Sequence, residues 1–290
     1  MLAERQITAK TLVCVGLDPL LENLPKPLAE TYKHNLPGAV AEWMKNITDA
    51  TAPLALMFKP QIAHWEAIPD GIEMLRLLIR HIHCAYPTTP VFLDCKRGDI
   101  ARTQQQYRKA CLDRTGADGM NFCPYMGKDT MSALVDKGRL DRALVGLCYT
   151  SNPDAREVQD VTARFCNQNM PYWAFIANRT LGWAQDLGVV ENAGLVMAAA
   201  YENPKGSGNV YSEHLVRCRQ IVGDKLWFLI PGVGKQQGHV AETVHTAYTG
   251  PGSIAINSSS GITEASSGPD YAEAAAGKAC ELRDQINASL

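Results

Sequence analysis

The stretch FLDCKRGDIARTQ, residues 92–104, decides the fold and holds the chemistry. It begins as an apolar run typical of a buried strand, and it places two carboxylates and a lysine within six positions. Side chains alternate along a strand, so Asp94 and Lys96 should point to the same side. We expect both at the C-terminal end of a strand, with Asp99 where the next helix begins and Thr103 one turn further on.

Seven other apolar runs rich in β-branched residues recur along the chain. They cover residues 11–17, 54–59, 117–122, 142–149, 193–200, 226–232 and 253–259. Segments of helical period lie between them, such as residues 71–85 with one apolar face. This alternation, with near-continuous apolar strands, predicts an α/β fold of the (β/α)8 TIM barrel type. A doubly wound sheet is the alternative, but its Gly-x-Gly-x-x-Gly fingerprint is missing after the first strand.

No Gly/Ser-rich linker divides the sequence, so we expect residues 1–290 to form a single domain. The longest connection, residues 150–192, predicts an enlarged loop after strand 5 of the barrel. We expect helices for both of its patterned segments, residues 156–168 and residues 179–188.

Composition excludes several classes of function. A net charge of −2 provides no global positive field for nucleic acid or an anionic membrane. The charged N-terminus and the lack of an 18-residue apolar run indicate a cytoplasmic protein. Nine cysteines without a Cys-x-x-Cys pair indicate reduced thiols in the core.

Two more strand ends bring charges to the predicted mouth of the barrel. The motif GLDP ends the first strand with Asp18, and FKPQ ends the second with Lys59. Lysine and aspartate side chains in one pocket keep each other ionised. We therefore expect a cationic Lys96, which suits proton donation to a carbanion better than Schiff-base chemistry.

An anion site is predicted at the far end of the chain. PGVGKQQG, residues 231–238 with Gly234 inside, follows the seventh strand, and NSSSG, residues 257–261, follows the eighth. Barrels often bind phosphate with these two loops, through backbone N–H groups freed by glycine. We predict no metal site, because His81 and His83 are two positions apart on a helix and diverge.

Together the motifs resemble the orotidine 5′-phosphate decarboxylase family, in its longer bacterial type. The similarity runs through VCVGLDP, FKPQIAHWE, FLDCKRGDIARTQ, LCYTSNPDAREVQ, IPGVGKQQG and SSGPDYAEAAAGKACELRDQIN, nearly the whole length. The resemblance implies decarboxylation of orotidine 5′-monophosphate to UMP in de novo pyrimidine synthesis, without a cofactor.

The resemblance also implies roles for individual residues. An alternating charged network would do the chemistry, with Lys96 stabilising and protonating the C6 carbanion; its members are Lys59, Asp94, Lys96 and Asp99. Substrate contacts are implied for Asp18 and Lys59 at the ribose, Ser151 at the pyrimidine amide edge and Gln236 between base and phosphate. Asp99 and Thr103 would reach into a neighbouring subunit's site, which implies a homodimer.

One position departs from the family pattern. The family places an arginine after the eighth strand, as Ser-Arg-Gly, whereas this chain has Ser260 between Ser259 and Gly261. A charge-assisted contact to phosphate is worth roughly 1.5–3 kcal/mol, so its loss would weaken the phosphate grip by about one to two decades. Lys235 is a candidate substitute, and an unchanged kcat/KM in Lys235→Ala would exclude it.

Two rival functions stay open at this point. One is a magnesium-dependent sugar-phosphate lyase or synthase of the same superfamily, which shares Asp-x-Lys-x-x-Asp but has an acidic metal ligand where this chain has Lys59. The other is a catalytically impaired nucleotide-binding variant marked by Ser260.

Overall fold

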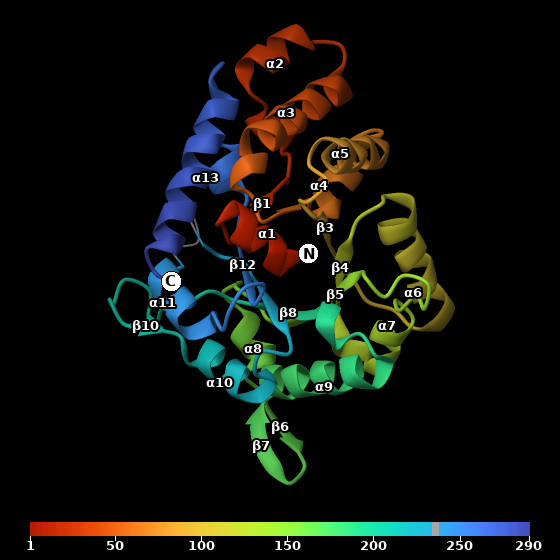
Figure 1. The fold of residues 1–290 in the computed structure, drawn as a ribbon, viewed down its shortest axis with the longest axis vertical. Coiled ribbons are helices and arrows are strands. Elements are labelled where there is room, and N and C mark those ends of the chain that lie inside the picture. The colour runs from red at the N-terminus through yellow and green to blue at the C-terminus, as the bar shows by residue number, and fades with distance from the viewer. Residues whose placement is uncertain (234–237) are drawn as a thin grey trace.

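The computed structural model describes residues 1–233 and 238–290, and a parallel barrel lies at its centre (Figure 1). The barrel strands are β1 (Val13–Gly16), β2 (Met57–Lys59), β3 (Phe92–Arg97), β4 (Gly119–Phe122), β5 (Ala143–Tyr149), β8 (Ala193–Met197), β11 (Trp227–Ile230) and β12 (Ile254–Ser258). Their order is β2-β1-β12-β11-β8-β5-β4-β3. Parallel bridges from Phe58 to Val91 and from Gln61 to Asp94 join the two ends of the sheet. The predicted (β/α)8 barrel is confirmed.

Helices surround this barrel (Figure 1). They are α1 (Leu2–Ala9), α2 (Lys26–Thr31), α3 (Leu36–Thr51), α4 (Ile62–Glu66), α5 (Gly71–Ala85), α6 (Ala101–Arg108), α7 (Lys128–Ser132), α8 (Ala155–Gln159), α9 (Tyr172–Leu187), α10 (Glu213–Val222), α11 (Val240–Ala247), α12 (Ser260–Thr263) and α13 (Tyr271–Asn287). Helix α5 buries Leu75, Leu78, Ile79 and Ile82, as its sequence period predicts. Each such side chain contributes about 1.5–3 kcal/mol by leaving water.

The barrel strands are buried on both faces. Every residue of β1, β11 and β12 is buried, and Phe58, Phe122 and Phe228 are fully enclosed. Parallel strands covered by helices outside and side chains inside must be apolar throughout, which is why their runs are so clear in the sequence.

The connection after β5 is enlarged, as predicted, but its first half is not one helix. After the short α8, the chain forms a hairpin of β6 (Thr162–Phe165) and β7 (Gln168–Pro171), which projects from the ring of helices (Figure 1). The predicted helix over residues 156–168 is therefore wrong. Cys166 and Asn167 both have positive φ, as a tight two-residue hairpin turn requires. The second predicted helix is confirmed within α9.

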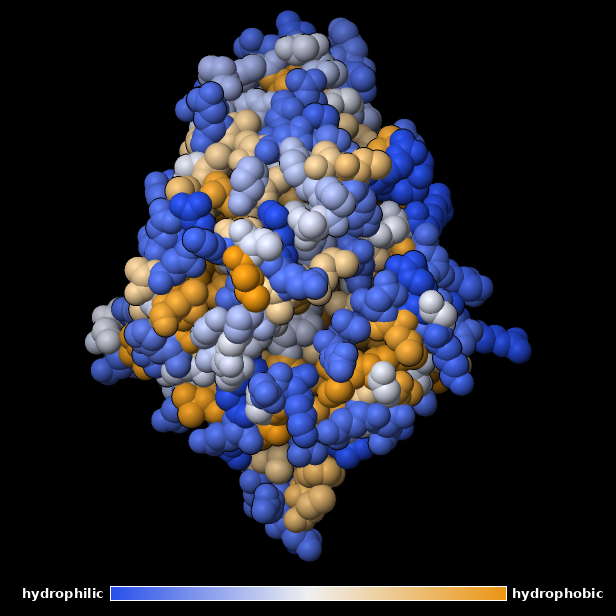
Figure 2. Space-filling view, viewed as in Figure 1, coloured by the Kyte–Doolittle hydropathy of each residue, from blue (hydrophilic) through white to orange (hydrophobic). Residues whose placement is uncertain are grey.

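A second small hairpin follows β8. It pairs β9 (Tyr201–Glu202) with β10 (Val210–Tyr211) and was not predicted. At the opposite end of the barrel, α1 lies across the strand starts, over a cavity of about 710 Å³. Figure 2 views this α1 face, where small apolar patches interrupt a mainly hydrophilic surface. Among the described residues, no helix is both long and apolar enough to cross a bilayer.

Candidate active site

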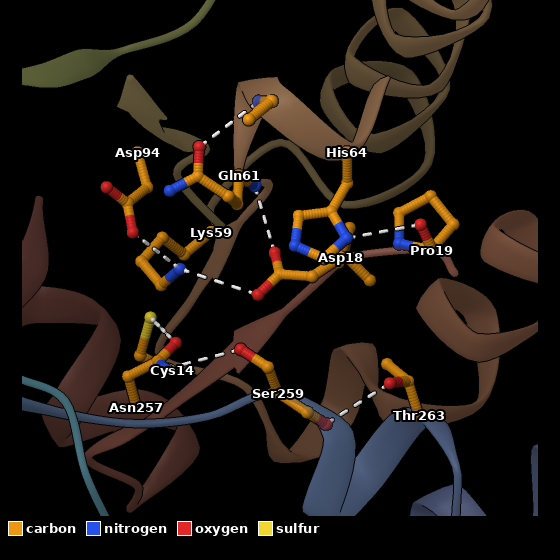
Figure 3. Close-up of polar contacts among 12 residues, drawn as sticks. Cys14, Asp18, Pro19, Lys59, Gln61, His64, Asp94, Asn257, Ser259 and Thr263 are labelled. Atoms are coloured by element: carbon orange, nitrogen blue, oxygen red, sulfur yellow. Dashed lines mark hydrogen bonds and ion pairs between the residues drawn. The ribbon is translucent and has the colours of Figure 1, made fainter. Parts of the chain in front are cut away.

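A network of alternating charges lies at the C-terminal ends of β1, β2 and β3. Its members are Asp18, Lys59, Asp94 and Lys96. Lys59 Nζ is 3.1 Å from Asp94 Oδ2 and 3.9 Å from Asp18 Oδ2. Lys96 Nζ donates to the other Asp94 oxygen, Oδ1, at 2.5 Å. Figure 3 shows Lys59 between the two carboxylates. The barrel thus brings together four of the predicted site residues.

Burial and opposite charge shift the pKa values of Lys59 and Asp94, at the centre of this network, in opposite directions. Lys59 is 3% exposed and Asp94 is 8% exposed. Burial alone would lower the pKa of Lys59, but Asp18 and Asp94 outweigh it and raise the pKa. Burial likewise would raise the pKa of Asp94, but Lys59 and Lys96 outweigh it and hold the pKa well below its usual range. Both groups are therefore ionised at neutral pH.

Asn121, on β4, fixes the end of β3 and was missed by sequence reasoning. Its Nδ2 donates to Asp94 Oδ1 at 2.6 Å, and its Oδ1 accepts from the N–H groups of Cys95 at 2.9 Å and Lys96 at 2.6 Å. Lys96 has φ of 46°, and the β3–β4 register shifts between Leu93 and Arg97. An amide inside the buried run GMNF was the available signal, because a buried polar side chain needs partners.

The loop after β1 is pinned so that Asp18 faces Lys59. Asp18 Oδ1 accepts from the backbone N–H of Gln61 at 2.9 Å. Trp65 Nε1 donates to the carbonyl of Leu17 at 2.9 Å, and His64 Nδ1 lies 3.2 Å from the carbonyl of Pro19. The start of α4 therefore holds the loop that carries the carboxylate (Figure 3).

Asp99 and Thr103 lie apart from the network of Asp18, Lys59, Asp94 and Lys96. Asp99 is partly exposed and accepts from the N–H of Ile100 at 2.7 Å, while Thr103 is exposed on α6. Across the described residues, no ion pair links Asp99 to Lys96. Their apolar neighbours Ile100 and Tyr125 are 46% and 80% exposed, on loops that lie side by side after β3 and β4.

The loop after β12 lies against the end of β1. A Cβ on Gly16 would lie 1.9 Å from Ser259 Oγ, so only glycine permits this approach. Asn257 Nδ2 is 3.4 Å from Ser259 Oγ, and Cys14 Sγ is 3.5 Å from Asn257 Oδ1. Burial raises the pKa of Cys14 to about 12, which keeps it a thiol beneath Lys59. Ser260 begins α12 and is half-buried.

A cavity of about 570 Å³ lies at the ends of β5, β8 and β11 and holds the remaining predicted site residues that the structure describes. Ser151 lies on its wall, as do Gly232 and Gly238 at the two ends of the predicted phosphate loop. Gly234, Lys235 and Gln236 lie outside the described residues.

His81 and His83 both lie on α5. His81 Nε2 lies 2.6 Å from Asp49 and His83 Nε2 lies 3.0 Å from Asp118, so the two rings have different carboxylate partners.

Known proteins similar to this chain in sequence and in fold are orotidine 5′-phosphate decarboxylases. Residues 11–276 match the model of the orotidine 5′-phosphate decarboxylase / HUMPS family. The orotidine 5′-phosphate decarboxylase of Bordetella petrii is 37% identical over 96% of this chain and 93% of its own, and that of Ralstonia nicotianae is 39% identical over the same shares. A Toxoplasma gondii protein solved as a putative orotidine-monophosphate-decarboxylase superposes with a TM-score of 0.78 at 26% identity, over 99% of this chain and 96% of its own. This chain therefore belongs to the orotidine 5′-phosphate decarboxylase / HUMPS family.

Proposed function

We propose that Lys96, Asp94 and Lys59 carry out the decarboxylation of orotidine 5′-monophosphate to UMP. The family and the curated relatives make this chain an orotidine 5′-phosphate decarboxylase, a lyase of pyrimidine synthesis. The observation that supports the mechanism is the pair of lysines on the two oxygens of one buried carboxylate.

The bond between C6 of the pyrimidine and its carboxylate breaks, carbon dioxide leaves, and the electron pair remains on C6. Lys96 then transfers an ammonium proton to C6. Its positive charge stabilises the carbanion before transfer, in a site whose charges are already in place. Asp94 next to the substrate carboxylate disfavours the bound ground state, and it anchors Lys96 through their hydrogen bond.

The family resemblance suggests the other substrate contacts. Asp18 and Lys59 bind the ribose hydroxyls, and Ser151 reads the amide edge of the pyrimidine. Gln236 connects base and phosphate, with Gly234 in the phosphate loop. Ser260 offers the phosphate a hydroxyl and no charge, so the grip from α12 is weaker than an arginine would provide.

The first test is the loss of orotidine monophosphate absorbance with purified protein, run with and without EDTA. Because the proposed chemistry uses only side chains, we expect equal rates in both conditions. EDTA sensitivity would favour the magnesium-dependent sugar-phosphate class instead. Absence of turnover in either condition would favour a binding protein.

We also propose a homodimer in which Asp99 and Thr103 complete the partner's site. The exposed apolar residues Ile100, Tyr125 and Met126 on the same rim support such an interface. The protein then acts as a single barrel domain, residues 1–290, in the cytoplasm, where its nine free cysteines remain reduced.

Mixed variants test this dimer. Lys96→Ala and Asp99→Ala homodimers should each be nearly inactive. After subunit exchange, hybrid dimers contain one site with both residues intact, so about a quarter of wild-type activity should return in an equimolar mixture. If the mixture stays as inactive as its parents although exchange is shown by tagged subunits, Asp99 does not act across an interface.

A further inference from the structure

The cavity at the ends of β5, β8 and β11 has a basic wall that the proposed chemistry does not use. Arg156, on α8, and Lys205, in the turn between β9 and β10, both line it. Neither side chain forms an ion pair with a carboxylate in residues 1–233 and 238–290. The acidic residue of the wall, Glu202, is directed elsewhere: it accepts from the N–H of Gly206 at 2.7 Å and lies 3.8 Å from His239 Nε2.

Arg156 is held in a fixed orientation although it is exposed. Its guanidinium donates to the Tyr201 hydroxyl and, at 3.2 Å, to Asn203 Oδ1. Its Cζ lies 5.1 Å from the centre of the Tyr201 ring and 5.9 Å from that of Tyr211. A cation held by neutral acceptors and aromatic rings keeps its full charge for a ligand, and ordering it in advance lowers the entropic cost of binding.

The support beneath Arg156 is rigid and uncharged. Tyr211 stacks on His214 with an interplanar angle of 16°, and Tyr149 Oη lies 3.3 Å from Tyr201 Oη. His214 is fully buried, and its Nε2 lies 2.8 Å from the carbonyl of Ala198. Burial lowers the pKa of His214 to about 4, so this ring is neutral at physiological pH.

The same cavity reaches both ends of the predicted phosphate loop. Gly232 and Gly238 line it, and the N–H of Gly238 donates to the carbonyl of Gly232 at 3.0 Å. Ser151, the proposed reader of the pyrimidine, lines it too. A phosphate bound here would therefore share one cavity with the proposed pyrimidine reader.

We infer that Arg156 and Lys205 bind the phosphate monoester of the substrate and supply the positive charge that Ser260 lacks. This inference rests on the proposed function. Arg156 supplies a fixed planar fork that suits two phosphate oxygens, while Lys205 adds a point charge from the exposed turn.

The test compares orotidine monophosphate with orotidine, which has no phosphate. Arg156→Gln should lower kcat/KM for the monophosphate roughly 10- to 100-fold and leave kcat/KM for orotidine unchanged. Lys205→Gln should have a smaller effect in the same direction. Arg217→Gln is the matched control, since Arg217 is also exposed over an aromatic ring, that of Trp173, but lies outside this cavity. Arg217→Gln should leave kcat/KM unchanged for both substrates.

A rescue sharpens the test. In the Arg156→Gln background, Ser260→Arg should restore most of the lost kcat/KM for the monophosphate. Binding of inorganic phosphate, measured by calorimetry, should weaken in Arg156→Gln and persist in Arg156→Lys. This binding measurement does not depend on turnover, so it tests the site even if the wild type fails to decarboxylate the substrate.

Three results would overturn the inference. An equal decrease in kcat/KM for both substrates would mean that Arg156 supports the fold around the active site. The melting temperature of Arg156→Gln would then decrease too. Unchanged kinetics in the double variant Arg156→Gln/Lys205→Gln would place the phosphate elsewhere. Weaker phosphate binding with an unchanged kcat/KM for the monophosphate would assign the cavity to a separate anion.

Discussion

Replacing Lys96 by alanine should lower kcat on the order of 10⁴- to 10⁶-fold, because the variant loses both the proton donor and the charge facing the carbanion. The effect should appear in kcat more than in KM, since both contributions act in the transition state. Single-turnover decay of orotidine monophosphate absorbance measures it.

The melting temperature of Lys96→Ala distinguishes a loss of catalysis from unfolding. The Lys96 side chain is 48% exposed, so the melting temperature should change little. Lys45→Ala is a close control, because that lysine is 50% exposed and lies 2.6 Å from Asp49. It should keep full activity. A Lys96→Ala enzyme within tenfold of wild type would exclude Lys96 as the proton donor.

Replacing Asp94 by asparagine should remove activity and also destabilise the fold. Asp94 is 8% exposed and accepts from Lys59, Lys96 and Asn121, so its loss leaves Lys59 buried with Asp18 alone, at 3.9 Å. Breaking a buried pair by removing one partner costs about 3–5 kcal/mol. Urea unfolding should show this decrease in the free energy of unfolding near neutral pH.

The pH dependence of that decrease has a defined sign. The folded-state pKa of Asp94 lies below the ordinary value of 3.8, so on acidification the unfolded chain takes up its proton first. The stabilisation is complete above about pH 5 and declines as the pH falls through the folded pKa. The gap between wild type and Asp94→Asn should therefore shrink at acidic pH.

An exposed pair provides the comparison. Asp141 is 63% exposed and lies 3.0 Å from Arg139, so Asp141→Asn should cost less than about 1 kcal/mol. A loss in Asp94→Asn no larger than this control would show that the Lys59–Asp94 pair does not stabilise the fold.

The sequence predicted the barrel and most of the charged site residues because both leave a local signal along single strands. A parallel strand buried on both faces must be a continuous apolar run, and barrel enzymes place polar groups at the C-terminal end of such runs. Asp18, Lys59, Asp94 and Lys96 could therefore be read from strand ends. The hairpin at Thr162–Phe165 was missed because its turn depends on positive φ at Cys166 and Asn167, and neither residue is glycine.

By itself, then, the sequence determined the eight-strand barrel, the charged residues at three strand ends and the lack of an arginine at Ser260. Only the tertiary structure decided which side chains share partners. Asn121 reaches Asp94 across 27 residues, and Arg156 reaches Tyr201 across 45, because neighbouring barrel strands bring distant segments within hydrogen-bond distance. Periodicity reports which face of one element is buried, whereas a hydrogen bond between two elements depends on their register in space.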